Sequence, residues 1–272
     1  MAAKVLRVGK VAIGGKRPVF ILGPCVIESE KFVWRMAREI LKMCCAEDVD
    51  LIFKASYDKA NRTSVKSFRG FGPRQGCEVL AAVGQELKIP VTTDVHSPDE
   101  AKLAGEMIDL LQIPAFLCRQ TDLLKAAAQT GRAVNVKKGQ FLAPWDVRNI
   151  AEKLENFGCK NYVFTERGVS FGYNNLVADM RSLYWIKQQG YPVIFDATHS
   201  VQRPGSAGDA TGGDGELAPV LARAAVAAGC DGVFIETHID PAKALSDGPN
   251  QIPLKELPNL LSQLQRIHEI VH

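Results

Sequence analysis

Eight short runs of apolar, largely β-branched residues recur along the chain, and each run is bounded by turn residues. Between them lie segments with the three-to-four-residue spacing of amphipathic helices. Because parallel strands need crossovers that return over the face of their sheet, this alternation predicts a parallel sheet covered by helices. The predicted strands are residues 19–27, 49–56, 89–96, 107–114, 133–138, 162–167, 191–199 and 232–238.

The helical segments have recognisable ends. Glycine follows four of them, at positions where a left-handed cap is needed, namely Gly131, Gly158, Gly190 and Gly229. The clearly predicted helices are residues 31–46, 76–87, 122–130, 146–157, 176–189, 216–228 and 254–271.

The chain length selects among parallel architectures. With 272 residues, 46% of them apolar, the chain can build one large hydrophobic core. Eight strand–helix units of this size predict an α/β fold, a closed (β/α)8 or TIM barrel, as a single domain spanning residues 1–272. An open doubly wound sheet is the alternative, but its GxGxxG turn after the first strand is absent. Residues 5–8 and 11–13, within the N-terminal segment 1–16, predict a hairpin that closes the N-terminal end of the barrel.

Charge and hydropathy exclude several classes of protein. The 33 basic and 30 acidic residues give a net charge of +3, and the basic residues are scattered, unlike those of a nucleic-acid-binding face. No apolar run reaches 18 residues, and Lys4, Arg7 and Lys10 interrupt any signal-peptide core. Seven cysteines without a CxxC pair predict buried, reduced thiols. We therefore expect a cytoplasmic protein that binds neither nucleic acid nor membrane.

Polar side chains gather at the predicted carboxyl ends of the strands, which face one common mouth in a closed barrel. A single cation at a strand end is most often solvated. Here Lys54, Lys59, Lys137 and Arg167 arrive from three strands, and their mutual repulsion predicts an anionic ligand such as phosphate or carboxylate. Other polar residues at these ends are Glu28, Ser56, Asp94, His96, Gln112, Lys138, Glu166, Asp196 and His238.

Two loops extend this mouth. Residues 59–64 supply an amide, a guanidinium and two hydroxyls, which indicates either a second anion site or an ordinary polar turn. Residues 202–213 are rich in glycine and lack periodicity. That pattern is typical of a mobile cover over an active site, or of a floppy surface insertion.

A metal site is one interpretation of four dispersed residues, Cys25, His199, Glu236 and Asp247. The first three end strands that become neighbours when the barrel closes, and Asp247 lies in the loop after the last strand. A thiolate, an imidazole and two carboxylates suit zinc, iron(II), cobalt(II) or manganese(II) better than magnesium or calcium. Because the spacing is not the tight spacing of CxxC or HExxH motifs, satisfied buried polar groups are the alternative.

Four strings make the chain recognisable: GPCVIES at residues 23–29, KASYDKANRT at 54–63, QIPAFLCRQ at 112–120 and DATHSVQ at 196–202. With residues 135–140 and 171–175, they show that the chain resembles the 3-deoxy-D-manno-octulosonate 8-phosphate synthases from about residue 20 to residue 253. Enzymes of this family condense phosphoenolpyruvate with arabinose 5-phosphate and release inorganic phosphate. Their product enters the inner core of lipopolysaccharide.

The resemblance implies a role for each candidate residue. The carboxylate of phosphoenolpyruvate would meet Lys54, Ser56 and Lys59, with Gln112 nearby, and its phosphate would meet Lys137 and Arg167, with Lys138 as a neighbour. Arabinose 5-phosphate would meet Asn61, Arg62 and Thr63, with Asp94 on its hydroxyls and Arg119 reaching its phosphate from an adjacent subunit of a homotetramer. Thr63 stands where many relatives carry serine, and it keeps the hydroxyl. The candidate catalytic residues are Lys54, Lys59, His199 and Asp247.

The same family divides into metal-dependent members, with cysteine after Gly-Pro, and metal-independent members, with asparagine there. Cys25 therefore implies the metal-dependent class, with zinc, iron(II), manganese or cobalt held by Cys25, His199, Glu236 and Asp247. The nearest alternative is the sister synthase that makes 3-deoxy-D-arabino-heptulosonate 7-phosphate from erythrose 4-phosphate, whose motif lacks an asparagine equivalent to Asn61. A non-catalytic barrel that binds sugar phosphates is a third interpretation.

Overall fold

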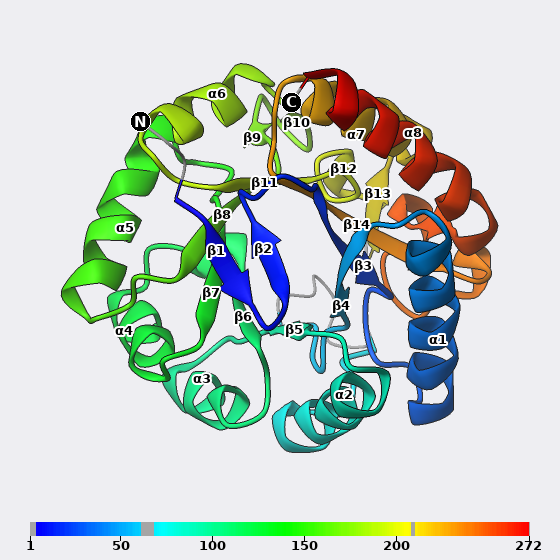
Figure 1. The fold of residues 1–272 in the computed structure, drawn as a ribbon, viewed down its shortest axis with the longest axis horizontal. Coiled ribbons are helices and arrows are strands. Elements are labelled where there is room, and N and C mark those ends of the chain that lie inside the picture. Colours follow the sequence, from blue (N-terminus) through cyan, green and yellow to red (C-terminus); the bar gives the residue numbers. More distant parts are fainter. Residues whose placement is uncertain (1–3, 61–67, 208–209, 272) are drawn as a thin grey trace.

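The computed structural model describes residues 4–60, 68–207 and 210–271 (Figure 1). Within these ranges eight parallel strands close into a barrel: β3 (Val19–Gly23), β4 (Asp50–Lys54), β5 (Val91–Asp94), β6 (Leu110–Ile113), β7 (Ala133–Lys137), β8 (Tyr162–Glu166), β11 (Val193–Asp196) and β14 (Gly232–His238). Each strand pairs with the next along the chain, β14 pairs with both β11 and β3, and the ring is complete. The predicted TIM barrel and all eight predicted strands are confirmed.

Eight α-helices in the described residues surround this barrel (Figure 1). They are α1 (Glu30–Ala46), α2 (Pro73–Leu87), α3 (Pro98–Gly105), α4 (Thr121–Gln129), α5 (Val147–Asn156), α6 (Arg181–Gln188), α7 (Ala218–Ala227) and α8 (Leu257–Val271). The four glycines expected after helices all adopt positive φ, between 73° and 92°. None of the described helices has the combination of length and apolarity that crossing a membrane requires.

Short elements complete the connections. They are the 3-10 helices η1 (Ala115–Leu117), η2 (Pro144–Asp146), η3 (Gly215–Leu217), η4 (Pro241–Lys243), η5 (Gly248–Asn250) and η6 (Leu254–Glu256), and the strand β15 (Ile252–Pro253). None of the seven cysteines is in a disulfide, and all except Cys45 are buried; burial was the expectation for most of them.

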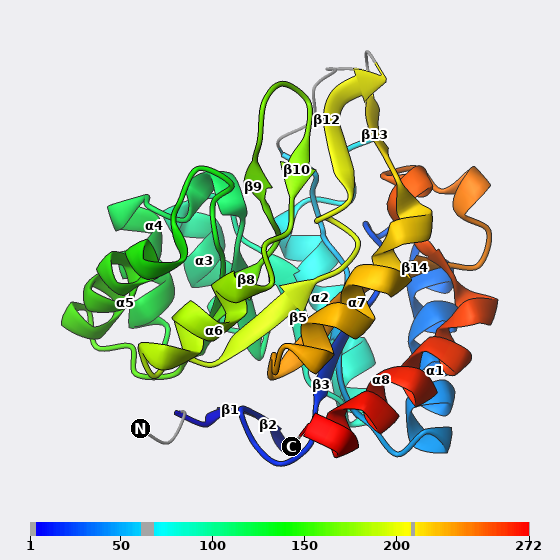
Figure 2. The same ribbon diagram turned by 90° about the horizontal axis from the view of Figure 1, so that it is seen from above.

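The N-terminal hairpin closes one end of the barrel, as predicted. Strands β1 (Leu6–Val8) and β2 (Val11–Ile13) pair antiparallel around a turn at Gly9. Figures 1 and 2 show the hairpin lying across the barrel end opposite the loops that follow the strands. Its inward side chains pack against a layer of apolar side chains from the barrel strands; this lower layer comprises Val19, Ile21, Ile52, Leu110, Ala133, Val163, Ile194 and Phe234.

Two segments contain strands that the sequence analysis did not predict. The helix expected over residues 176–189 begins only at Arg181, because Leu176–Val177 (β10) pairs with Val169–Ser170 (β9). The segment 202–213, in which no strand was predicted, contains the hairpin β12 (Gln202–Ala207) and β13 (Ala210–Gly213). Figure 2 shows both hairpins projecting from the carboxyl end of the barrel. The turn-rich and glycine-rich composition of both segments hid these short strands, although their pairing is local.

Helix α3 was not predicted. Ser97 caps it by accepting a hydrogen bond from the Glu100 amide at 3.2 Å, and Pro98 occupies its first turn. The sequence Ser-Pro-Asp-Glu is a capping-box pattern followed by few apolar residues. The capping signal was therefore present, but the weak periodicity of an eight-residue helix concealed it.

Candidate active site

Two buried lysines meet above an aromatic ring at the carboxyl end of the barrel. Lys54 ends β4 and Lys137 ends β7, and they are 1% and 6% exposed. The Nζ atom of Lys137 lies 3.9 Å from the ring centroid of Phe234, and that of Lys54 lies 5.5 Å from it. Phe234 also belongs to the lower layer that packs against the hairpin. It therefore forms the boundary between the apolar interior and the charged mouth.

Carboxylates face these cations. Lys54 Nζ donates to Glu236 Oε1 at 2.5 Å, and Lys59 Nζ lies 3.6 Å from the same oxygen. Lys137 Nζ donates to Asp196 Oδ2 at 2.7 Å. The sequence predicted that the cations would repel one another, but the structure shows that each is balanced by an acidic partner two strands away around the barrel.

The ion pairs determine how these groups ionise. Burial alone would raise the pKa of Glu236, but Lys54 and Lys59 outweigh it and hold that pKa well below 4.5. Burial likewise acts to raise the pKa of Asp196, and His199 and Lys137 lower it instead. Burial would lower the pKa of Lys59, yet the anionic groups around it raise that pKa above its usual value. At neutral pH Glu236, Asp196 and Lys59 are therefore charged.

Asp196 also orients His199. The imidazole Nδ1 lies 2.8 Å from Asp196 Oδ2, and the His199 amide donates to Asp196 Oδ1 at 2.9 Å. Burial lowers the pKa of His199 in spite of this carboxylate. A neutral imidazole that donates its Nδ1 proton to Asp196 carries its lone pair on Nε2, which faces Glu236 Oε1 at 3.6 Å. Two electron-rich atoms facing each other fit a cation between them.

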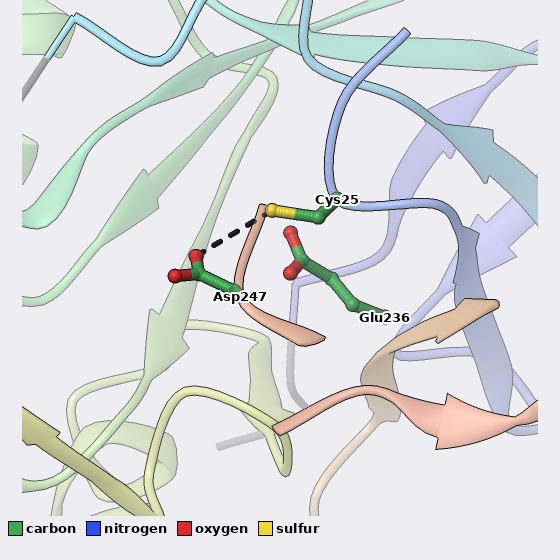
Figure 3. Close-up of side chains that lie close together, drawn as sticks. All are labelled: Cys25, Glu236 and Asp247. Atoms are coloured by element: carbon green, nitrogen blue, oxygen red, sulfur yellow. Dashed lines mark hydrogen bonds between the residues drawn. The ribbon is translucent and has the colours of Figure 1, made fainter. Parts of the chain in front are cut away.

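A group of potential metal ligands lies beside these residues. The ligand atoms of Cys25, Glu236 and Asp247 all lie within 4.8 Å of one another (Figure 3). The Sγ atom of Cys25 is 2.9 Å from Ser246 Oγ and 3.5 Å from Asp247 Oδ2. Burial, with a contribution from Glu236, raises the pKa of the Cys25 thiol to about 12. Only a strong cation would keep a thiolate here, so the donor set fits a divalent metal.

The structure thus brings together three of the four expected ligands, and His199 adjoins them through Glu236. Close packing of Gly23, at the end of β3, against Lys54 positions Cys25 two residues later. A Cβ atom on Gly23 would lie 1.8 Å from the carbonyl oxygen of Lys54, so only glycine allows this approach. The Lys54 ammonium then donates to the carbonyl oxygen of Cys25 at 3.0 Å.

A chain of hydrogen bonds crosses the other side of the mouth. Asp94 accepts from Ser56 Oγ and from Gln112 Nε2, both at 2.6 Å. Gln112 Oε1 accepts from Asn135 Nδ2 at 3.0 Å, and Asn135 Oδ1 accepts from Thr165 Oγ1 at 2.7 Å. Lys54, Lys59 and Lys137 together hold the pKa of Asp94 below its usual value, although burial opposes them. The network fixes the orientation of both amide side chains.

Asn135 and Thr165 were not singled out by the sequence analysis as candidate site residues. Their signal was available, because each lies two residues before a predicted cation of the same strand segment, Lys137 or Arg167. Residues two apart on a strand share a face. Both side chains therefore belong to the interior of the barrel.

Arg167 follows β8 and is held from two sides. One of its terminal nitrogens donates to the carbonyl oxygen of His199 at 3.0 Å and to Gln202 Oε1 at 2.6 Å. Burial lowers the pKa of this guanidinium, and its Nε atom is buried without a hydrogen-bond partner. A buried N–H group of this kind is costly unless an acceptor binds to it. Its neighbour Lys138 differs, since its Nζ donates to the carbonyl oxygen of Leu142 at 2.9 Å.

Four predicted site residues remain, three in the segment 61–63 and one, Arg119, on the surface. Asn61, Arg62 and Thr63 fall outside the described residues. Arg119 is exposed in the loop between η1 and α4, and its carbonyl oxygen accepts from Lys153 Nζ at 3.0 Å. Among the described residues, no hydrogen bond joins the Arg119 side chain to another predicted site residue.

Comparison with known proteins places this site in context. A sequence profile described as the DAHP synthetase I family matches residues 3–272. A protein of Geotalea uraniireducens (strain Rf4) named 2-dehydro-3-deoxyphosphooctonate aldolase is 56% identical over 269 residues, which cover 98% of this chain and 99% of that protein. Proteins of the same name from Pelobacter propionicus (strain DSM 2379 / NBRC 103807 / OttBd1) and Geobacter sulfurreducens (strain ATCC 51573 / DSM 12127 / PCA) are 57% and 54% identical, covering 97% and 98% of both chains. The barrel with its charged mouth, matched over nearly its whole length, belongs to the DAHP synthetase I family.

Proposed function

We propose that this chain is a 3-deoxy-D-manno-octulosonate 8-phosphate synthase. The reaction joins phosphoenolpyruvate, D-arabinose 5-phosphate and water, and yields 3-deoxy-D-manno-octulosonate 8-phosphate and inorganic phosphate for the inner core of lipopolysaccharide. The name and high identity of the curated relatives support this activity. The observation that carries it in the structure is the convergence of Lys54 and Lys137 over Phe234 beside the Cys25 cluster.

Phosphoenolpyruvate binds across the floor of the mouth in this proposal. Lys137 and Arg167 hold its phosphate, and the unpartnered Nε of Arg167 supports that assignment. Lys54, Ser56 and Lys59 hold its carboxylate side, with Gln112 adjoining. Because the carboxylates of Asp196 and Glu236 already partner Lys137 and Lys54, substrate anions share these cations with the protein.

Arabinose 5-phosphate binds nearer the surface. Asn61, Arg62 and Thr63 receive it, and Asp94 accepts hydrogen bonds from its hydroxyls. The lowered pKa of Asp94 supports this role, because an ionised carboxylate is acceptor-only. Arg119 reaches the sugar phosphate from an adjacent subunit of a homotetramer, and its exposure is compatible with a role outside its own mouth.

A divalent ion, either zinc, iron(II), manganese or cobalt, is held by Cys25, His199, Glu236 and Asp247. When bound, it supplies Lewis acidity to an oxygen of the sugar substrate or of water. The mixed soft and hard donors support a metal of this class.

The side chains of the mouth promote the condensation through charge. The enol carbon of phosphoenolpyruvate attacks the sugar aldehyde, so two multiply charged anions must approach each other in a site shielded from water. Lys54, Lys59, Lys137 and Arg167 offset that repulsion. As the carbon–carbon bond forms, positive character develops at the former enol carbon, water adds there, and the tetrahedral product loses phosphate. Lys137 and Arg167 then stabilise the charge of the departing phosphate.

Release of inorganic phosphate from phosphoenolpyruvate, assayed with each aldose, tests the proposal. We expect release with arabinose 5-phosphate and little with erythrose 4-phosphate. A preference for erythrose 4-phosphate would assign the chain to the sister synthase, and no release with either sugar would indicate a binding protein. For Arg62→Ala, the apparent affinity for the sugar phosphate should fall more than that for phosphoenolpyruvate.

Chelation tests the metal. We expect exhaustive chelation to abolish turnover and added divalent ion to restore it, while Cys25→Asn loses bound metal and keeps some turnover. Full turnover of the chelated protein would reject metal dependence. Unchanged metal content in Cys25→Asn would show that Cys25 is not a ligand.

A further inference from the structure

Two loops carry the metal-ligand cluster, and one glutamate outside the cluster joins them. Cys25 lies in the loop between β3 and α1, and Asp247 ends the loop that runs from β14 to η5. Glu28 belongs to the first loop. Its Oε1 atom accepts a hydrogen bond from the Leu245 amide of the second loop at 2.9 Å. Leu245 lies two residues before Asp247, so this contact holds the chain close to that candidate metal ligand.

His238 lies against the same carboxylate of Glu28. Its Nδ1 accepts from the Asp240 amide at 2.9 Å, which places the proton of the neutral ring on Nε2. That Nε2 atom lies 3.4 Å from Glu28 Oε1, in electrostatic contact although the geometry is not that of a hydrogen bond. Phe32 of α1 packs on the imidazole with a centroid distance of 4.8 Å. His238 and Glu28 therefore link β14 to the loop after β3.

The second loop needs such support. Asp247 adopts φ 48° and ψ 30°, a left-handed conformation that residues other than glycine rarely adopt. Residues in this region persist when their surroundings constrain them. Ser246 Oγ, next along the chain from Leu245, lies 2.9 Å from the Cys25 thiol, and both side chains are buried. The two residues that follow Leu245 in the chain, Ser246 and Asp247, therefore both contact Cys25.

We propose that Glu28 is a positioning residue that holds the loop carrying Ser246 and Asp247 against the loop carrying Cys25. This inference deepens the proposed metal site and rests on it. Glu28 is not one of the proposed ligands; it acts through the loops that carry them. Without the carboxylate, the Leu245 amide loses its acceptor, His238 loses its charged neighbour and the second loop moves away from Cys25. The thiol then becomes accessible and the ligands lose their common geometry.

Alkylation of individual cysteines in the full-length, chelated protein tests the positioning role directly. We expect Glu28→Ala to raise the alkylation rate of Cys25 about tenfold or more, measured by peptide mass spectrometry, because an opened loop exposes the thiol. The rates of Cys44, Cys77, Cys118, Cys159 and Cys230 should stay unchanged. Glu28→Gln, which keeps an oxygen for the Leu245 amide, should remain near wild type. Glu30→Ala, an exposed glutamate in the first turn of α1, is the matched control.

Two alkylation outcomes would overturn the inference. One is an unchanged Cys25 rate in Glu28→Ala. The other is an equal rise at all buried cysteines, which would mean general destabilisation.

Cobalt(II) titration adds a second readout that separates this inference from the metal proposal. The thiolate-to-cobalt absorption band should appear in the wild type, and Glu28→Ala should bind cobalt about 10- to 100-fold more weakly. Equal affinity in the two proteins would overturn the positioning role. Absence of the band in the wild type would reject the metal site, and the alkylation rates would still decide whether Glu28 holds the loops together.

Discussion

The two ends of the barrel interior are built by the same strands and have opposite chemistry. At the hairpin end, the lower layer is apolar and buried, and it includes Ile52, Ile194 and Phe234. Two residues further along the same strands, the side chains are Lys54, Asp196 and Glu236. The same step joins Leu110 to Gln112, Ala133 to Asn135 and Val163 to Thr165. A single step along one strand face therefore separates the layer that stabilises the fold from the charged and polar layer at which we propose that substrate binds.

This arrangement divides the energetic roles. Each large apolar side chain of the lower layer, such as Ile52 or Ile194, contributes about 1.5–3 kcal/mol of stabilisation through burial. The paired charges above contribute little net stability, because desolvation offsets most of their attraction, yet breaking one pair leaves a buried charge without a partner. The hairpin end also has a pocket, of about 560 Å³, which is lined in part by Gly9 and Lys10 and lies away from the charged mouth. Substitutions at the two ends should therefore have separable effects.

The largest effect is expected at the mouth. Lys137→Ala should lower kcat/KM about 100- to 1000-fold, because it removes a cation that we propose stabilises the charge of the departing phosphate. Lys10→Ala, in the hairpin turn, should leave kcat/KM within about twofold. Steady-state phosphate release measures both, with circular dichroism as the check on folding. Wild-type kcat/KM in the Lys137 variant would remove the functional distinction between the two ends.

A substitution in the lower layer should have the opposite pattern, with a loss of stability and unchanged substrate binding. Ile194→Ala should lower the free energy of unfolding by about 2–5 kcal/mol, because it leaves a cavity in the lower layer. The folded fraction should keep its KM for phosphoenolpyruvate. Denaturant titration and kinetics on the same sample measure both quantities. A large change in KM with unchanged stability would mean that the two layers are not separate.

An intermediate effect is expected in the hydrogen-bonded chain of the mouth. Asn135→Ala leaves Gln112 Oε1 and Thr165 Oγ1 without their partner, at a cost of about 1–3 kcal/mol in unfolding free energy. Kinetics should show a moderate rise in KM for phosphoenolpyruvate, since Gln112 is no longer held. Unaltered stability and KM would show that the chain does not hold the amides.

The smallest effect concerns pH. Burial would raise the pKa of Glu100, but hydrogen bonds from His96 and Tyr57 lower it from 4.5 to about 2. A lowered folded-state pKa gives stability that is present above the unfolded value and is lost as pH falls through the folded one. Glu100→Gln should therefore melt below wild type at pH 6, and the difference should shrink towards pH 2. A difference that is constant with pH would contradict this.

The sequence predicted the barrel well, for a physical reason. Strands buried on both faces are continuous apolar runs, and Lys54, Lys137 and Glu236 at their ends interrupt those runs visibly. Seven of the eight predicted strands were longer than the observed ones, and the eighth, residues 232–238, matches β14. The strand predicted at residues 19–27, for example, became Val19–Gly23, because apolar residues continue into the loop.

What the sequence could not supply was contact between distant segments. The pairing of Lys54 with Glu236 and the chain of hydrogen bonds from Asp94 to Thr165 both depend on how the barrel strands are arranged around the ring and in what register. The contact between Glu28 and Leu245 joins residues 217 positions apart. Candidate residue types were recognisable, but their partners were not.

The most direct test of the account is a crystal structure with bound phosphoenolpyruvate. We expect the ligand at the carboxyl end of the barrel, above Phe234, with its phosphate against Lys137 and Arg167. Density for the ligand in the pocket beside the hairpin, or contacts that leave Lys137 and Arg167 untouched, would contradict the division of the barrel into a stabilising end and a reacting end.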